Sequence, residues 1–152
     1  MLLGVGIDIL SLTRFQALIT RRSPQQLAKR ICSPTEYKRY QALAPSSTSN
    51  QDILRFLSTR SVLQLLFPLI GLMYRWVLKE AAYKALSAHV PITWKSLEVD
   101  KQPSGQPTVR YNPVDTTAGR STSMVGMEVD LMCTLSHDAG VVVGVVIAQT
   151  KT

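Results

Sequence analysis

Three groups of polar residues in this chain have types and spacings that could support chemistry. Glu80 and Lys84 are four residues apart in the segment 76–86, so on a helix they share one ridge. Asp8 interrupts an apolar segment, and Ser136-His137 follows another. Two carboxylates from separate elements can hold one Mg²⁺ through oxygen ligands and leave positions for water and phosphate. Taken alone, a Glu/Lys pair is more often an exposed ion pair worth roughly 0.3–0.5 kcal/mol.

The elements that must position these residues follow from local patterns. Residues 2–12 are apolar and β-branched, which predicts a buried strand with Asp8 either inside it or at its end. A carboxylate inside such a strand needs a charged partner or a metal ion. Residues 76–86 are nearly all strong helix formers, without Gly or Pro. Ser136-His137 falls in the connection 136–140 between two β-rich segments, 128–135 and 141–149.

The remaining patterns predict a single domain that contains both helices and strands. Ser33, Pro34 and Glu36 are spaced as the capping box of a helix that runs to about residue 43. Further helices are expected over 11–20, 24–31 and 52–60, a hairpin with strands over 92–98 and 107–111, and loops over 44–50 and 112–125. No repeat and no second core are evident, so residues 1–152 are expected to form a single domain.

The segment 61–74 differs from the rest of the chain. It has no charged residue and contains Pro68 and Gly71. It is shorter than the roughly 20 apolar residues of a membrane span, so no membrane association is expected. Pro68 and Gly71 are expected to disrupt a helix there.

Composition limits the class of partner. The 152 residues are 45% apolar and 18% charged, with a net charge of +7, which favours acidic partners. Neither a run of five Lys/Arg nor zinc-finger spacing occurs, so nucleic acid is not expected as a partner. Cys32 and Cys133 are too far apart in sequence to suggest a metal site or a disulfide framework. A reducing compartment is expected, the cytoplasm or alternatively the mitochondrion.

Several motifs occur together in a fixed order. They are Gly4-Val5-Gly6-Ile7-Asp8-Ile9 followed by Arg14-Phe15, then Phe56-Leu57-Ser58-Thr59-Arg60, then the helix 76–86, and finally Leu135-Ser136-His137-Asp138. In these motifs the chain resembles the holo-acyl-carrier-protein synthases, the short trimeric group of 4′-phosphopantetheinyl transferases. The resemblance implies an α+β fold in which an antiparallel sheet packs against a long central helix. Residues 94–99 and 105–107 also fit the hairpin of that family.

The resemblance also implies an activity. Members transfer 4′-phosphopantetheine from coenzyme A to a serine of apo-acyl carrier protein, in support of fatty acid biosynthesis. Asp8 and Glu80 would bind Mg²⁺, and Lys84 would neutralise or protonate the departing phosphate. The implied coenzyme A contacts also include Arg60, Arg75, Lys79, Ser136 and His137, with His137 at the 3′-phosphate. Arg14, Arg21 and Arg22 would dock the acidic carrier protein, and the assembly would be a homotrimer with sites between subunits.

The chain departs from the family pattern at residues 61–75. In the family, Phe-Leu-x-x-Arg places its Arg five residues before the metal-binding Glu. Here Arg60 ends that motif, while Arg75 stands five residues before Glu80, and deleting 60–74 or 61–75 restores the pattern. We therefore treat 61–75 as a foreign insert, such as a retained intron.

Two alternatives to an active enzyme remain open. One is an inactive relative or a mis-predicted gene product, and the other is a module that binds carrier protein or RNA without catalysis. A Ser-His hydrolase is disfavoured, because adjacent strand residues such as Ser136 and His137 point in opposite directions.

Overall fold

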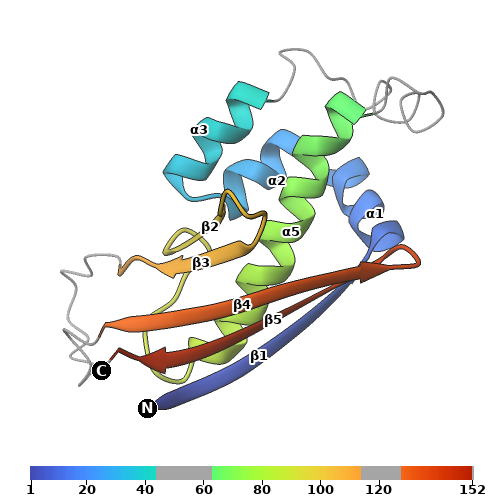
Figure 1. Cartoon of the computed structure of the whole chain (residues 1–152). Helices are drawn as coiled ribbons and strands as arrows, with labels where there is room; N and C mark the ends of the chain where they lie inside the picture. The colour runs from blue at the N-terminus through green and yellow to red at the C-terminus, as the bar shows by residue number, and fades with distance from the viewer. Residues whose placement is uncertain (44–62, 114–127, 152) are drawn as a thin grey trace.

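A computed structural model describes residues 1–43, 63–113 and 128–151 (Figure 1). Along the chain the elements are β1 (Leu2–Ser11), α1 (Leu12–Arg22), α2 (Pro24–Ile31), α3 (Pro34–Leu43), α5 (Leu63–Leu86), β2 (Leu97–Lys101), β3 (Pro107–Tyr111), β4 (Val129–Asp138) and β5 (Val141–Thr150). The mixture of helices with antiparallel strands confirms the expected α+β class. Within the described residues, no helix has the length and apolar character needed to cross a membrane.

The strands form two antiparallel groups. β1, β5 and β4 lie side by side in that order, while β2 and β3 form a separate hairpin. β1 pairs with β5 from Leu2 opposite Gln149 to Ser11 opposite Val141, which places Asp8 opposite Gly144. Asp8 therefore lies inside the strand and not at its end.

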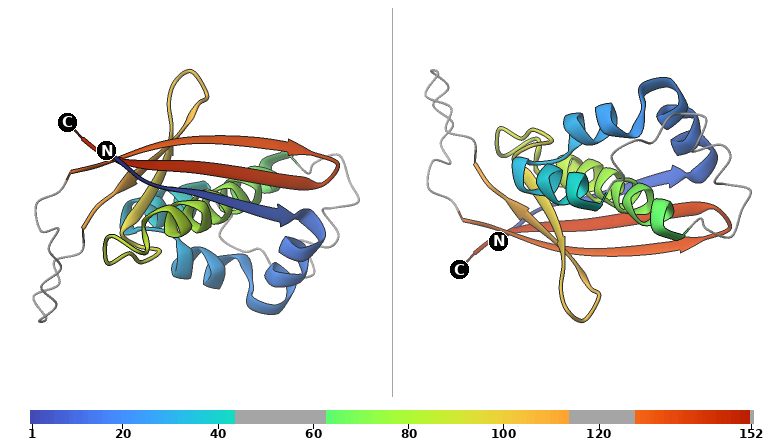
Figure 2. Two further views of the ribbon diagram at one scale, coloured as in Figure 1. Left: turned by 90° about the horizontal axis from the view of Figure 1, so that it is seen from below. Right: turned by 90° about the horizontal axis from the view of Figure 1, so that it is seen from above.

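Helix α5 is the centre of the molecule. The views from below and above show the long strands on one side of α5 and helices α1–α3 on the other (Figure 2). Leu72, Met73 and Val77 of α5 pack into a core shared with α1 and α2. Ala81, Ala85 and their neighbours pack into a second core with β2, β3 and β5. A helix that is apolar on nearly every side is expected to be buried in this way.

The short helices begin where the sequence predicts. The Ser11 and Ser23 hydroxyls accept hydrogen bonds from the backbone N–H groups of Arg14 and Gln26, which cap α1 and α2. The capping box of α3 is also confirmed. The Ser33 N–H donates to Glu36 Oε2 at 2.6 Å, and the Glu36 N–H donates to Ser33 Oγ at 3.2 Å.

Two expectations about secondary structure are wrong, one for the segment 61–74 and one for the first hairpin strand. Pro68 and Gly71 do not interrupt the helix, because α5 runs through both and buries Leu72 and Met73 just beyond them. The first hairpin strand begins at Leu97 and not at residue 92, since Thr93 and Ser96 exchange hydrogen bonds in a turn.

Ser136 and His137 also lie elsewhere than expected. They belong to β4, which continues to Asp138 before a two-residue turn at Ala139 and Gly140. Both turn residues have positive φ, 47° and 75°, as a tight hairpin turn requires. The expected helix 52–60, the loop 44–50 and most of the loop 112–125 lie outside the described residues.

Candidate active site

The site is created by an unusually close approach between β1 and α5. A Cβ atom placed on Gly6 would lie 1.8 Å from the carbonyl oxygen of Ala81, and one on Gly4 would lie 2.4 Å from that of Ala85. Only glycine allows the strand backbone to rest directly on the helix backbone at these two positions. The Gly-x-Gly sequence therefore brings the next facing residue, Asp8, to the surface of α5.

Asp8, Glu80 and Lys84 meet at this crossing. The Lys84 ammonium donates hydrogen bonds to Asp8 Oδ1 and to the Ile7 carbonyl oxygen, each at 2.8 Å. The Asp8 side chain is 15% exposed and that of Lys84 is 48% exposed, so the pair lies at the protein surface. The structure thus brings together the three residues that the sequence assigned to catalysis.

Glu80 is half-buried beside this pair. Burial is the largest cause that raises the pKa of the Glu80 carboxyl, followed by the negative charge of Asp8. The charges of Lys84 and Arg14 act in the opposite direction. A second carboxylate so close to Glu80 makes this position suited to a cation that both side chains share.

The donor chemistry fits a hard divalent ion. In the described part of the chain, no group of three or more His, Cys, Asp or Glu could enclose a metal. Mg²⁺ commonly uses only one or two protein carboxylates and completes its shell with water and substrate phosphates. Asp8 and Glu80 are therefore the residues that would hold it.

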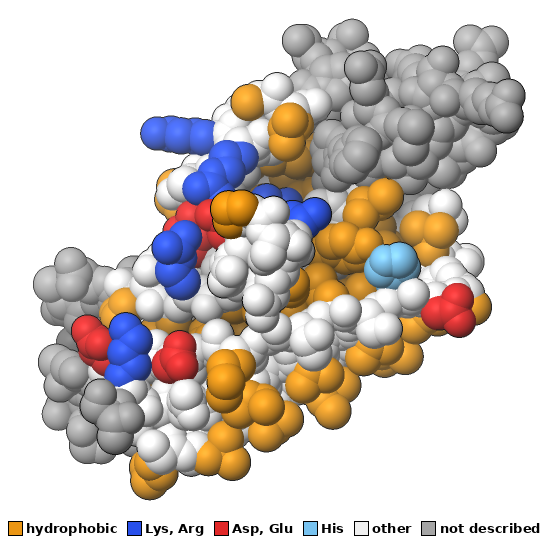
Figure 3. Space-filling view, in the orientation of Figure 1, with side chains coloured by type: hydrophobic (Ala, Val, Ile, Leu, Met, Phe, Trp, Pro, Cys, Tyr) orange, Lys and Arg blue, Asp and Glu red, His pale blue; other side chains and the backbone are white. Residues whose placement is uncertain are grey.

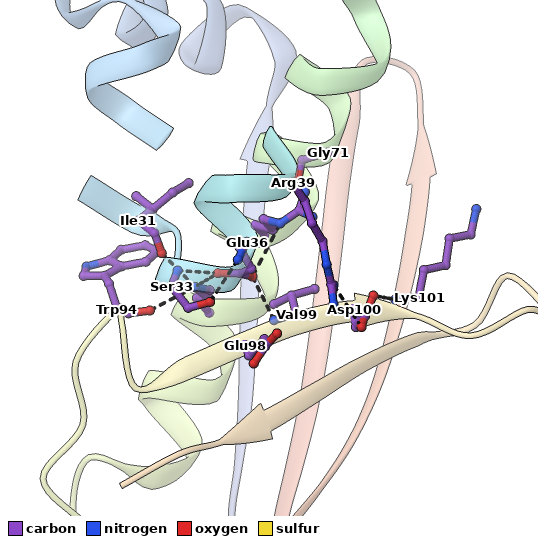
Figure 4. Close-up of polar contacts among 12 residues, drawn as sticks. Ile31, Ser33, Glu36, Arg39, Gly71, Trp94, Glu98, Val99, Asp100 and Lys101 are labelled. Carbon is purple, nitrogen blue, oxygen red and sulfur yellow. Dashed lines mark hydrogen bonds and ion pairs between the residues drawn. The ribbon is translucent and has the colours of Figure 1, made fainter. Parts of the chain in front are cut away.

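A buried ion pair fixes the rotation of α5 next to the site. The Lys79 ammonium donates to Glu36 Oε2 at 2.6 Å, to the Ile31 carbonyl at 2.7 Å and to the Trp94 carbonyl at 2.9 Å. Glu36 Oε1 also accepts the Val99 N–H at 2.8 Å. Figure 4 shows Glu36 of α3 beside Ser33 and beside Val99 of β2, with Ile31 of α2 and Trp94 close by.

Adjacent helix residues project about 100° apart, so this anchor determines where Glu80 points. With Lys79 held in the interior, Glu80 is directed toward β1. Sequence reasoning identified Glu36 only as a capping residue. Its second role had no local signal, because it depends on elements distant in the chain.

The expected coenzyme A contact at Lys79 is not supported by this arrangement. Lys79 is 1% exposed, and its three ammonium protons all have protein acceptors. Burial lowers its pKa, although Glu36 partly offsets that effect. An ammonium so deeply enclosed and so fully hydrogen-bonded is not available to a phosphate.

Arg75 and His137 line a common pocket on the opposite side of α5. The pocket has a volume of about 420 Å³ and is also lined by Tyr74, Gly105 and Pro107. Arg75 Nη1 donates to the Gly71 carbonyl at 3.0 Å, and its Nε lies 3.4 Å from Glu36 Oε1. That ion pair lacks hydrogen-bond geometry, and Nε has no hydrogen-bond partner among the described residues.

The other predicted residues are distributed more widely. Arg14, Arg21 and Arg22 are exposed on α1, and Arg14 is near enough to Glu80 to affect its pKa. Ser136 is exposed on β4 and does not line the pocket that contains His137. Arg60 lies outside the described residues.

A model of the 4′-phosphopantetheinyl transferase superfamily matches residues 4–129. The chain belongs to this superfamily. The matched range includes Asp8, Glu80 and Lys84.

Individual transferases of this superfamily resemble the chain over almost its whole length. A holo-[acyl-carrier-protein] synthase of Ralstonia nicotianae is 30% identical, with 97% of this chain and 94% of that protein covered. The synthase of Streptomyces griseus is 33% identical, with 98% and 99% covered.

Solved structures support the same fold. The holo-[acyl-carrier-protein] synthase of Neisseria meningitidis matches with a TM-score of 0.67 at 21% identity, covering 98% of this chain and 99% of that one. The Bacillus anthracis synthase, solved in complex with coenzyme A (3′,5′-ADP), matches with a TM-score of 0.63 at 18% identity, with 100% and 99% covered. The expected phosphopantetheinyl transferase fold is thereby confirmed.

Proposed function

We propose that this chain is a holo-[acyl-carrier-protein] synthase. It transfers the 4′-phosphopantetheine group from coenzyme A to a serine of apo-acyl carrier protein and so supports fatty acid biosynthesis. The observation that carries the proposal is that Asp8, Glu80 and Lys84 lie close together where β1 crosses α5. The names of the relatives support the same activity.

The reaction exchanges one phosphorus–oxygen bond for another. The serine oxygen of the carrier protein bonds to the phosphorus that bears the pantetheine arm, and its proton passes to a water molecule that acts as the base. The bond from that phosphorus to the bridging oxygen breaks, and adenosine 3′,5′-bisphosphate departs with the electron pair. Charge accumulates on the departing oxygens, so the residues must stabilise anionic oxygen.

Lys84 is positioned for this task. Its ammonium already donates hydrogen bonds to Asp8 and to the Ile7 carbonyl at the protein surface, and about half of the side chain is open to solvent. A bound pyrophosphate would compete for that ammonium, which would then neutralise or protonate the departing phosphate. Asp8 and Glu80 would hold Mg²⁺, which when bound offsets the negative charge of the pyrophosphate. Asp8 would at the same time exchange its partner Lys84 for the metal.

The nucleotide would occupy the pocket that contains His137. Because this pocket lies on the opposite side of α5 from Asp8 and Glu80, the pyrophosphate of the same coenzyme A would lie against Asp8 and Glu80 of a neighbouring subunit in the proposed trimer. Arg75 and His137 line its wall, and His137 is the proposed contact of the 3′-phosphate. A volume of about 420 Å³ is in the range of small-molecule sites.

The proposed macromolecular partner is an acidic carrier protein. Arg14, Arg21 and Arg22 are exposed on one helix of a chain with net charge +7, and Arg14 lies near Glu80. Charge complementarity of this kind raises association rates and weakens with salt. Replacing Arg21 and Arg22 by Ala should raise the KM for carrier protein, whereas Arg110→Ala on β3 should not.

A homotrimer is the proposed assembly. Val5, Ile7 and Ile9 are 53%, 57% and 61% exposed on the face of β1 opposite Gly6 and Asp8. Apolar side chains also gather along the strands at the lower edge of Figure 3. Exposed apolar patches commonly mark subunit interfaces. Ile7→Asp should reduce the mass measured by light scattering, while Leu43→Asp at the exposed end of α3 should leave it unchanged.

The cytoplasm is the proposed compartment. Cys32 and Cys133 are free thiols, as is usual in a reducing environment. Cell fractionation with a tagged chain tests this assignment.

The activity is tested by label transfer from coenzyme A to apo-acyl carrier protein in the presence of Mg²⁺. Asp8→Ala and Glu80→Ala should abolish transfer, and Glu128→Gln, at an exposed carboxylate paired with Lys151, should retain it. Full activity in the first two variants would show that the metal assignment is wrong. Carrier-protein binding without turnover would favour the inactive alternative.

The whole chain is proposed to act as one transferase domain, with 61–75 as a foreign insert. Sequencing the transcript tests whether this segment is translated. The transfer assay should therefore be run on the full chain and on a chain that lacks 61–75.

A further inference from the structure

The ring of Tyr74 packs against the ring of His137. The two ring centroids are 6.2 Å apart and the planes are inclined by 22°, which is a stacked arrangement. His137 is exposed near the end of β4, whereas Tyr74 is half-buried on α5. Stacking on the less mobile ring therefore limits the orientations that the imidazole can adopt.

Both rings line the pocket of about 420 Å³. Stacking occupies one face of the His137 ring and leaves the edge that carries the ring nitrogens available for hydrogen bonds. Arg75 lines the same pocket and is next to Tyr74 in sequence. A phosphate in the pocket would thus meet an imidazole whose orientation is already fixed.

We propose that Tyr74 is a positioning residue that orients His137 for the 3′-phosphate of coenzyme A. This inference rests on the proposed function and deepens it. Tyr74 acts through His137 on nucleotide affinity and does not act on the transfer step. The ring is the effective group, so the phenolic hydroxyl is not required.

Tyr74 belongs to the segment 61–75, so this segment supplies the ring that orients His137. Leu57-Ser58-Thr59-Arg60 and Leu72-Met73-Tyr74-Arg75 share the pattern Leu-x-x-Arg. Deleting 61–75 would place Thr59 six residues before Glu80, the position that Tyr74 now occupies. The longer chain therefore carries an aromatic ring where the shorter chain would carry a hydroxyl. The segment would set the affinity for coenzyme A.

Steady-state kinetics on the full chain test the proposal. Tyr74→Thr should raise the KM for coenzyme A by about two- to tenfold, the range expected for loss of one aromatic pair, with kcat unchanged. Tyr74→Phe should retain the KM of the original chain. With 3′-dephospho-coenzyme A as substrate, Tyr74→Thr should have no effect, because the phosphate that His137 contacts is missing. The chain lacking 61–75 should reproduce the KM of Tyr74→Thr.

A spectroscopic measurement separates this inference from the proposed function. His137 and His89 are the two histidines, so His89→Gln leaves a single imidazole signal. Tyr74→Thr should shift that signal, and adenosine 3′,5′-bisphosphate should perturb it more weakly than with Tyr74 present. An unchanged KM for Tyr74→Thr in an active enzyme overturns the inference alone. If the original chain transfers nothing, the proposed function fails, and the nucleotide titration at His137 decides the inference.

Discussion

Replacing Gly6 by Ala should move the central helix and disable the site. The new Cβ would lie 1.8 Å from the Ala81 carbonyl oxygen and 2.9 Å from the Ala85 backbone nitrogen. Backbone atoms in a buried helix cannot turn aside as a side chain can. Restoring an ordinary carbon–oxygen contact of about 3.3 Å requires a displacement of roughly 1.5 Å between β1 and α5.

The expected losses follow from that displacement. Overpacking of a core costs about 1–3 kcal/mol and occasionally more, and this contact is severe, so we expect about 3 kcal/mol or more. The same movement would separate Lys84 from Asp8 and Ile7, now 2.8 Å apart in each case. A misplacement of about 1 Å can lower a rate about 100-fold, so kcat/KM should fall at least that far.

Urea unfolding and the transfer assay measure the two effects. Gly71→Ala is the matched control for stability, because its Cβ would meet only the far end of the flexible Arg75 side chain, at 2.9 Å, and that end can shift away from its hydrogen bond to the Gly71 carbonyl. Within a helix this change should be neutral or stabilise the protein by up to about 1 kcal/mol. If Gly6→Ala keeps the stability and kcat/KM of the original chain, the close approach of strand and helix does not position the site.

Three other changes have definite expected results. Glu80→Gln should abolish transfer yet raise the free energy of unfolding at pH 7 without metal. Burial and Asp8 raise the pKa of Glu80 in the folded state, so its ionised form destabilises the fold. The gain should vanish as the pH falls below the ordinary pKa of Glu, about 4.3, where the folded and unfolded chains are both protonated; urea titrations across pH measure it. Glu36→Gln should cost about 3–5 kcal/mol in thermal or urea unfolding, because it leaves Lys79 as an uncompensated buried charge, and adding Lys79→Met should recover much of the loss. Burial raises the pKa of Cys32 to about 11, so thiol reagents at pH 8 should label it only after unfolding; rapid labelling of the folded chain would contradict its burial.

The sequence allowed prediction of those site residues that belong to local motifs. A carboxylate in an apolar strand and a Glu/Lys ridge are visible in short segments, but the assignment of Asp8 and Glu80 as metal ligands depended on the ordered set of motifs that resembles the family. Glu36 was identifiable only as a cap, since its contacts with Lys79 and Val99 join elements far apart in the chain.

The wrong expectations for the helix at Pro68 and Gly71 and for the side chain of Lys79 have a common physical cause. Pro68 and Gly71 weaken a helix locally, but burial of Leu72 and Met73 in the core favours the helical path of α5. Lys79 and Glu80 are neighbours of similar polarity, and only the packing of α2 and α3 decides which one faces inward. Local propensity could not predict either outcome, because tertiary packing determines both.

The pairing of β1 with β5 has a consequence for how the enzyme is made. Among the described elements, β1 precedes and β5 follows all the others, and together they form the register that places Asp8 opposite Gly144. Contacts between such distant segments give a high contact order and slow folding. During synthesis, α5 with Glu80 and Lys84 leaves the ribosome well before β5 can align the strand that carries Asp8. Asp8 and Glu80 would therefore come together late in folding.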